Sequence, residues 1–170
     1  LEISELKDLG QYKILIRNPQ NYLIQYVDDS PGILTISEAS LSFNPEAQTI
    51  AYGENPVMDP LAISGFAYGE DASVLSDESG SIPYYFVREG DVNEYTIGGE
   101  LKMPVGVYDI FIKDDPTDNY VIEYAEGRGQ LTVTEASIVF NPVDLEYSYG
   151  TLPQIDPASI TGFAEGEGPE

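Results

Sequence analysis

The sequence predicts a mainly β protein made of tandem compact repeats, β-grasp-like or sandwich-like, with at most single-turn helices. Two observations lead to this expectation. Long segments of the chain recur at a fixed spacing, which is typical of repeat architectures. Short apolar runs alternate with polar residues at the period of two that marks a β-strand. In addition, 12 Pro and 16 Gly leave no uninterrupted helical pattern of three turns.

The recurring segments define the domain organisation. GILTISEASLSFNP begins at Gly32 and GQLTVTEASIVFNP begins at Gly129, an offset of 129 − 32 = 97 residues. Positions 32–70 and 129–167 share 20 identities in 39 without a gap. The shared TxxEAS segment leads into the next unit near Ala39 and Ala136. We therefore expect residues 1–39 to close a first repeat, residues 40–136 to form a complete repeat, and residues 137–170 to open a third.

The strands are predicted from alternation within each run. Residues 107–113 place Tyr108, Ile110 and Ile112 on one face, and residues 120–124 and 131–134 alternate in the same way. The earlier copy keeps this phase at residues 12–16 and 22–26, so we expect these faces to form a core. Residues 83–86 are also expected to form a strand. The glycines at 98–99 and 127–129 are predicted to form hairpin turns, because neither has the spacing of a phosphate-binding loop.

Two short segments are candidates for a single helical turn. These are residues 59–62 and residues 70–75, and each begins with acidic residues, which suits the positive end of a helix dipole.

These motifs together resemble a known family. Tyr52-Gly53-x-x-Pro56, Ile63-Ser64-Gly65-Phe66 and Gly69-Glu70-Asp71 are similar to the first half of an MBG-type domain. Gly106-Val107-Tyr108, Asn119-Tyr120 and Leu131-Thr132-Val133 are similar to its second half. The resemblance covers residues 40–136 and parts of both flanks. It implies a β-rich module found in tandem in large bacterial surface proteins, an extracellular address and no catalytic residues.

Charge and composition exclude several classes of function. The chain has 30 acidic and 7 basic residues, a net charge of −23, and neither His nor Cys. Such a chain is a poor partner for nucleic acid or an anionic membrane. Zinc sites built on imidazole or thiolate and Ser-His-Asp or Cys-His catalysis are also excluded.

No apolar run approaches the ~20 residues of a membrane span, so we expect no direct membrane insertion. Residues from Leu1 carry no signal-peptide pattern, and we expect a segment of a longer protein.

The acidic residues that recur in both copies are Glu38 and Glu135, Asp59 and Asp156, and Glu70 and Glu167. Paired carboxylates suffice for glycoside hydrolysis, but thirty acids supply many pairs by composition alone. Asp before Pro is explained by turn formation, and Glu38 and Glu135 by a hydrogen bond at the repeat boundary. We therefore expect no enzyme, and we assign no catalytic, cofactor-binding or metal-binding residue.

Two binding functions remain as alternatives. Oxygen ligands for calcium are clustered at residues 28–30, 114–119 and 70–79, although none has EF-hand spacing. Tyr68 is replaced by Glu165 in the next copy, so we expect it to be exposed and available to a glycan or protein. The other recurring tyrosines follow strand alternation and are expected to lie in the core or to be half-buried in a sheet.

The function predicted from the sequence is that of a structural tandem-repeat segment. We expect the shaft of a stalk or filament in a secreted, cell-surface, adhesin-like bacterial protein. The expected partners are neighbouring repeats of the same protein, including head-to-tail self-assembly of the incomplete end repeats by strand complementation. The alternative is a glycan- or protein-binding module, with or without stabilisation by calcium.

Overall fold

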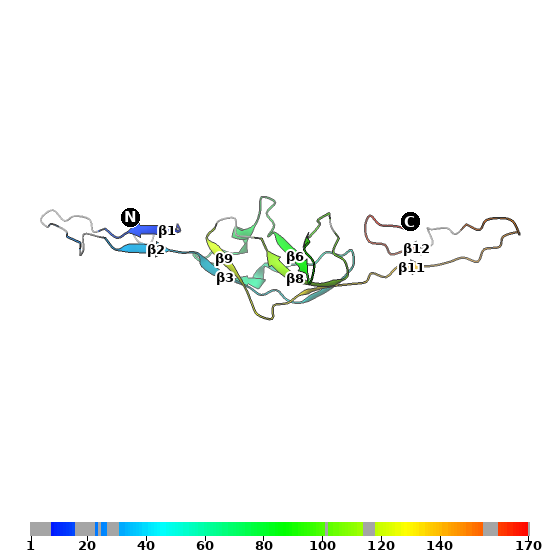
Figure 1. Ribbon diagram of the computed structural model, residues 1–170, viewed down its shortest axis with the longest axis horizontal. Helices are drawn as coiled ribbons and strands as arrows, with labels where there is room; N and C mark the ends of the chain where they lie inside the picture. The colour runs from blue at the N-terminus through cyan, green and yellow to red at the C-terminus, as the bar shows by residue number, and fades with distance from the viewer. Residues whose placement is uncertain are drawn as a thin grey trace.

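The structure is a computed structural model that describes residues 8–15, 23, 25–26, 31–100, 102–113, 118–154 and 160–169. Its parts follow one another along the long axis of the molecule (Figure 1). An N-terminal hairpin, formed by β1 (Gly10–Lys13) and β2 (Ile33–Ile36), leads into a central body of residues 39–134. A C-terminal segment, described at residues 136–154 and 160–169, extends on the opposite side of this body.

The central body contains a five-stranded sheet in the order β4-β10-β8-β6-β7. Its strands are β4 (Gln48–Ala51), β6 (Tyr84–Arg88), β7 (Glu94–Thr96), β8 (Gly106–Ile112) and β10 (Leu131–Thr134). Pairing is antiparallel except between β4 and β10, which are parallel. β8 has the predicted alternation, with Tyr108, Ile110 and Ile112 buried, because only one face of the sheet meets the core.

A three-stranded sheet in the order β5-β3-β9 completes the body. Its strands are β3 (Ala39–Phe43), β5 (Ile63–Ser64) and β9 (Tyr120–Tyr124), and β3 is parallel to β9. The chain passes from β3 to β4 alongside its passage from β9 to β10. Backbone hydrogen bonds hold these two passages together at 2.8 Å from Gly129 N to Pro45 O and 3.0 Å from Gln48 N to Gln130 O.

The core draws on both sheets. Phe43 of the smaller sheet meets Tyr84 of the larger one with ring centroids 6.0 Å apart. The fully buried side chains are Leu41, Phe43, Leu75, Phe86, Tyr108, Ile110, Leu131 and Val133. Burial of this many large apolar groups is the main stabilising term of the body. The expected burial of Tyr108 and Tyr120 is confirmed, whereas Tyr22 lies outside the described residues.

Both predicted helical turns are present as short 3-10 helices, η3 (Pro60–Ala62) and η4 (Ala72–Leu75). Asp59 caps η3 by accepting a hydrogen bond from Leu61 N at 2.9 Å, and Asp71 caps η4 in the same way through Ser73 N. This confirms the turn-forming role predicted for Asp59; Asp156 lies outside the described residues.

The prediction of hairpin turns at residues 98–99 and 127–129 is wrong. Turns do occur there, but β7 and β8 are not neighbours, since β6 lies between them, and β9 and β10 belong to different sheets. Gly129 instead allows two backbones to approach. A Cβ on this residue would lie 2.1 Å from Ala47 N. Glycine is therefore needed for close packing rather than for a tight turn.

The end segments are paired but exposed. β1 is antiparallel to β2, and β11 (Val139–Phe140) is antiparallel to β12 (Ile160–Thr161). Ile14, expected in a core, is 55% exposed, and Phe140 is 53% exposed. The expected core face of the first copy is therefore uncovered at Ile14, because the strands that cover its counterpart in the central body have no equivalent beside it among the described residues.

The fold class is thus mainly β, with 3-10 turns as the helical structure of the described residues. None of these residues belongs to a helix long and apolar enough to cross a bilayer.

Candidate functional site

The candidate site is the contact between the central body and the C-terminal segment. The turn after β12, residues 163–167, lies against the loop that follows β4. Tyr52 donates a hydrogen bond from its hydroxyl to Glu167 Oε1 at 2.6 Å. Lys102 Nζ is 3.4 Å from the same carboxylate oxygen and donates a hydrogen bond to the carbonyl oxygen of Glu165. We call this set of residues the joint.

Backbone packing adds a steric element to the joint. Gly53 has a φ of +90°, and a Cβ on this residue would lie 2.5 Å from Ala164 Cβ. Glycine is therefore required both by its backbone conformation and by the neighbouring segment. Gly150, its counterpart at the offset of 97, has a φ of +93°, but no described residue lies within 4 Å of such a Cβ. The two glycines thus differ in the contact and not in the conformation.

The polar groups of the joint perturb one another. The hydrogen bond from Tyr52, followed by the charge of Lys102, lowers the pKa of Glu167. Its partner in this bond, the Tyr52 hydroxyl, has a raised pKa chiefly because it donates to that carboxylate. The side chains of Lys102 and Glu167 remain 38% and 37% exposed, so solvent screens their ion pair. The joint therefore orients the segment more than it stabilises the fold.

The recurring acids lie in different settings. Glu167 belongs to the joint, whereas Glu70 accepts a hydrogen bond from the hydroxyl of Tyr120 within the central body. Glu38 and Glu135 are both exposed, and their boundary hydrogen bond stays a prediction. Tyr68 is 65% exposed, as expected from its replacement in the next copy.

Sequence reasoning missed Tyr52, Gly53 and Lys102 as partners. A signal for them was present, since Tyr-Gly recurs at residues 149–150 and Glu-Leu-Lys occurs at residues 5–7 and 100–102. Recurrence indicates that a position matters, but it does not say which segment lies against it.

A second feature is an open cavity of about 1230 Å³ in the central body. It is bounded by η3, η4, the loop of residues 76–83 and strands β6 and β7. Tyr84 lines it, and its buried hydroxyl has no hydrogen-bond partner among the described residues. Burial, together with the charge of Asp59, raises the pKa of Tyr84 to about 12. The phenol therefore stays protonated and able to donate a hydrogen bond at neutral pH.

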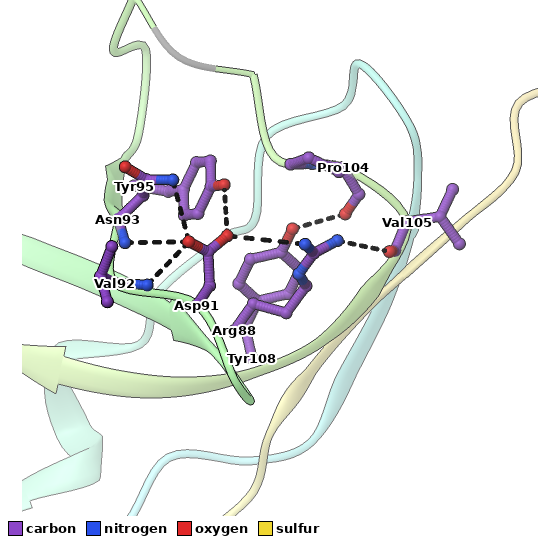
Figure 2. A network of polar contacts seen from close by, with 8 residues as sticks. All are labelled: Arg88, Asp91, Val92, Asn93, Tyr95, Pro104, Val105 and Tyr108. Atoms are coloured by element: carbon purple, nitrogen blue, oxygen red, sulfur yellow. Dashed lines mark hydrogen bonds and ion pairs between the residues drawn. The ribbon is translucent and has the colours of Figure 1, made fainter.

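A polar network near the β6–β7 turn is structural (Figure 2). Asp91 accepts hydrogen bonds from Asn93 N at 3.1 Å and from the Tyr95 hydroxyl at 2.9 Å, and it lies 3.6 Å from Arg88 Nη2. Tyr108 in turn donates its hydroxyl to Pro104 O. These hydrogen bonds fix the turn between β6 and β7 and give the hydroxyl groups of the buried Tyr95 and Tyr108 a partner each.

The calcium alternative has little geometric basis in the described part of the chain. No three carboxylates there are grouped closely enough to hold a metal ion. Asp71 and Asp77 instead accept hydrogen bonds from Ser73 N and Ser79 N. Residues 28–30 and 114–117 lie outside the described residues.

With this geometry in place, the chain was compared with family models, curated proteins and solved structures, and none of the three comparisons gives a match.

Proposed function

We propose that this chain is a structural segment, the shaft of a stalk or filament, in a secreted, cell-surface, adhesin-like bacterial protein. In this proposal the chain is non-catalytic. It consists of repeats of about 97 residues, with one complete unit at residues 40–136 between two partial ones. The type of unit, β-grasp-like or sandwich-like, is part of the same proposal.

Strand registers support the repeat. In the central body, β8 and β10 pair Gly106 with Val133 and Tyr108 with Leu131. Subtracting the sequence offsets of 96 and 97 gives the pairs Gly10 with Ile36 and Tyr12 with Leu34, which are those of β1 and β2. Likewise, the pair Phe43 with Ile63 becomes Phe140 with Ile160, which joins β11 and β12. Two kinds of strand pairing in the central body, β8 with β10 and β3 with β5, thus recur in the same register in the end segments.

The observation that carries the shaft proposal is the joint. Residues 135–138 connect β10 to β11, and the turn of residues 163–167 returns to contact Tyr52, Gly53 and Lys102. A segment attached at two places has far less rotational freedom than one attached by a flexible linker. A series of such joints makes a semi-rigid rod, which is the property a stalk requires.

A distance measurement on the monomer tests the joint. The chain has no Cys, so spin labels at Leu61→Cys and Leu152→Cys, which replace side chains 87% and 89% exposed, are unambiguous. We expect a narrow distance distribution in the parent chain. Tyr52→Phe combined with Lys102→Met should broaden it, because both polar contacts to Glu167 are lost. Tyr149→Phe is the matched control, because Tyr149 is fully exposed.

A distribution that is already broad in the parent chain would contradict the shaft proposal. So would an unchanged distribution in the double variant, because the joint would then not orient the segment. The measurement is made at low concentration, so that it reports on single molecules.

The cell-surface address rests on the resemblance to MBG-type domains, and the charge of −23 is consistent with a solvated, repelling surface. Antibodies raised against the chain are expected to label intact cells of its source. Labelling that needs permeabilised cells would contradict this address.

A glycan- or protein-binding module is the second candidate, and the cavity lined by Tyr84 favours it. A ligand there would raise the melting temperature by mass action. Melts with a glycan panel, and with calcium against a chelator, test this candidate. A shift that Tyr84→Phe reduces would favour it over a pure spacer.

A further inference from the structure

Two equivalent glycines differ in what surrounds them. Gly129 lies where residues 45–47 cross it, and a Cβ there would come within 2.1–2.6 Å of their backbone. Gly32 is its counterpart, 97 residues earlier in the chain. The atoms nearest to a Cβ on Gly32 would be those of Ile14, at 3.4–4.0 Å, and the backbone of Gly32 is not left-handed. Among the described residues, no contact closer than this requires glycine at position 32. A crossing segment like residues 45–47 would require it.

The chain contains a second segment whose sequence resembles that around the crossing residues 45–47. Asn44-Pro45 recurs as Asn141-Pro142, and the residues that follow are exposed. Leu145 and Tyr147, the counterparts of Gln48 and Ile50 of β4, are 47% and 45% exposed. Phe140 is 53% exposed, whereas Phe43 is fully buried.

The receiving edge is β2. In the central body β10 has β8 on one side and β4 on the other. β2 has β1 on the side that corresponds to β8, and its other side carries no strand among the described residues. Leu34 is 36% exposed, whereas its counterpart Leu131 is fully buried. The register of β4 on β10 would place Leu145 opposite Leu34 and Tyr147 opposite Ile36.

The joint supplies a second, independent match. Tyr149 and Gly150 are the counterparts of Tyr52 and Gly53, and both are open. In the joint, the Tyr-Gly pair contacts a turn with the sequence Phe-Ala-x-Gly-Glu. This sequence occurs twice in the chain, at residues 163–167 and at residues 66–70. The second of these lies on the central body, where Ala67 and Glu70 bond to the hydroxyl of Tyr120, the residue that pairs with Ala39 at the start of β3.

We propose that β2 and Gly32 of one copy receive residues 141–148 of a second copy in the register of β4 on β10, while Tyr149 and Gly150 of the second copy contact Ala67 and Glu70 of the first. The inference rests on the proposed repeat architecture. Within residues 1–170 the donor and the acceptor lie at opposite ends of the molecule (Figure 1), so the occupant that this proposal assigns to the edge is a second copy. Such a contact is heterologous and builds a head-to-tail filament.

Among the described residues, the segments that this proposal joins contain no counterpart of β6 and β7. The core of the joined unit is therefore smaller than that of the central body. We expect reversible association that increases with concentration.

Sedimentation velocity across a concentration series up to about 1 mM, where even weak interfaces are populated, tests the proposal. We expect the average mass of the parent chain to rise with concentration. Gly32→Ala should abolish the rise, because its methyl group would meet the incoming backbone, yet leave the far-UV spectrum unchanged. Gly168→Ala is the control, since nothing lies within 4 Å of its Cβ position. A monomeric parent chain, or a Gly32→Ala variant that associates normally, would overturn the proposal.

Register is tested by disulfide trapping between separately prepared chains. Thr35→Cys in one chain and Glu146→Cys in the other would be opposite each other, as Thr132 and Thr49 are in the central body. Mixed under mild oxidation, they should give a covalent dimer. Thr35→Cys with Leu152→Cys is the off-register control. Equal yields from the two mixtures would overturn the register.

These experiments separate the two proposals. The spin-label measurement reports on the joint within one molecule, whereas Gly32→Ala tests the contact between molecules and lies outside the joint. A rigid joint in a strictly monomeric chain would leave the shaft in place and remove the head-to-tail contact.

Discussion

At the level of single residues, four aspartates of the central body bond to backbone N–H groups nearby. Asp59, Asp71, Asp77 and Asp91 each accept a hydrogen bond from the N–H two residues later. This is the turn-forming behaviour typical of Asp. Hydrogen bonds from the side chains of Ser73 and Ser79, followed by those from their backbone N–H groups, lower the pKa of Asp71 and Asp77. The pKa of Asp91 is lowered chiefly by the backbone N–H of Asn93.

Asp91 gives a pH prediction. Its folded pKa lies below its unfolded value, so its contribution to stability is present above the unfolded pKa and is lost as pH falls through the folded pKa. In Asp91→Asn this acid-dependent part is removed. We expect lower stability at about pH 7 and a shallower loss toward about pH 3, measured by urea midpoints. Glu89→Gln, an exposed neighbour, is the control and should follow the parent chain. If stability falls equally steeply toward acid pH in the parent chain and in Asp91→Asn, the role assigned to Asp91 is contradicted.

At the level of elements, equivalent strands lie in different surroundings. β10 is covered on both edges and β2 on one, so equal sequence changes should have unequal effects. Leu131→Ala should cost ~2–5 kcal/mol, the usual range for a buried Leu. Leu34→Ala, in the exposed counterpart, should cost less than ~1 kcal/mol in the monomer. Thermal melts at low concentration check both values. Comparable losses would show that the N-terminal hairpin is buried in solution.

The elements also show how far sequence reasoning reaches. Alternation predicted the strand over 83–86 and the buried face of β8, and Asp before Pro predicted η3, because these depend on neighbours in the chain. The parallel pairing of β3 with β9 and of β4 with β10 was not predicted, since period-two patterns do not identify partners distant in sequence. For the same reason Gly129 was assigned to a turn. The joint was missed because it involves two units.

At the level of the whole molecule, a net charge of −23 acts against compactness through self-repulsion. Added salt screens that repulsion, with a Debye length that falls from about 30 Å at 0.01 M to about 8 Å at 0.15 M. We expect the melting temperature to rise over this range, because ion pairs such as Lys102 with Glu167 are exposed and contribute little. A calorimetric series in NaCl at fixed pH measures it. A melting temperature that falls with salt would mean that ion pairs outweigh repulsion.

The parallel pairs of the central body have a mechanical consequence. Tension along the chain enters at the start of β3 and leaves at the end of β10 (Figure 1). Because β3–β4 runs parallel to β9–β10, pulling these ends apart slides one ribbon along the other. The hydrogen bonds between them are then loaded together in shear, whereas an antiparallel hairpin pulled from its open end unzips one bond at a time. Under force spectroscopy the central body is therefore expected to yield in a single high-force event, after the exposed hairpins have already extended.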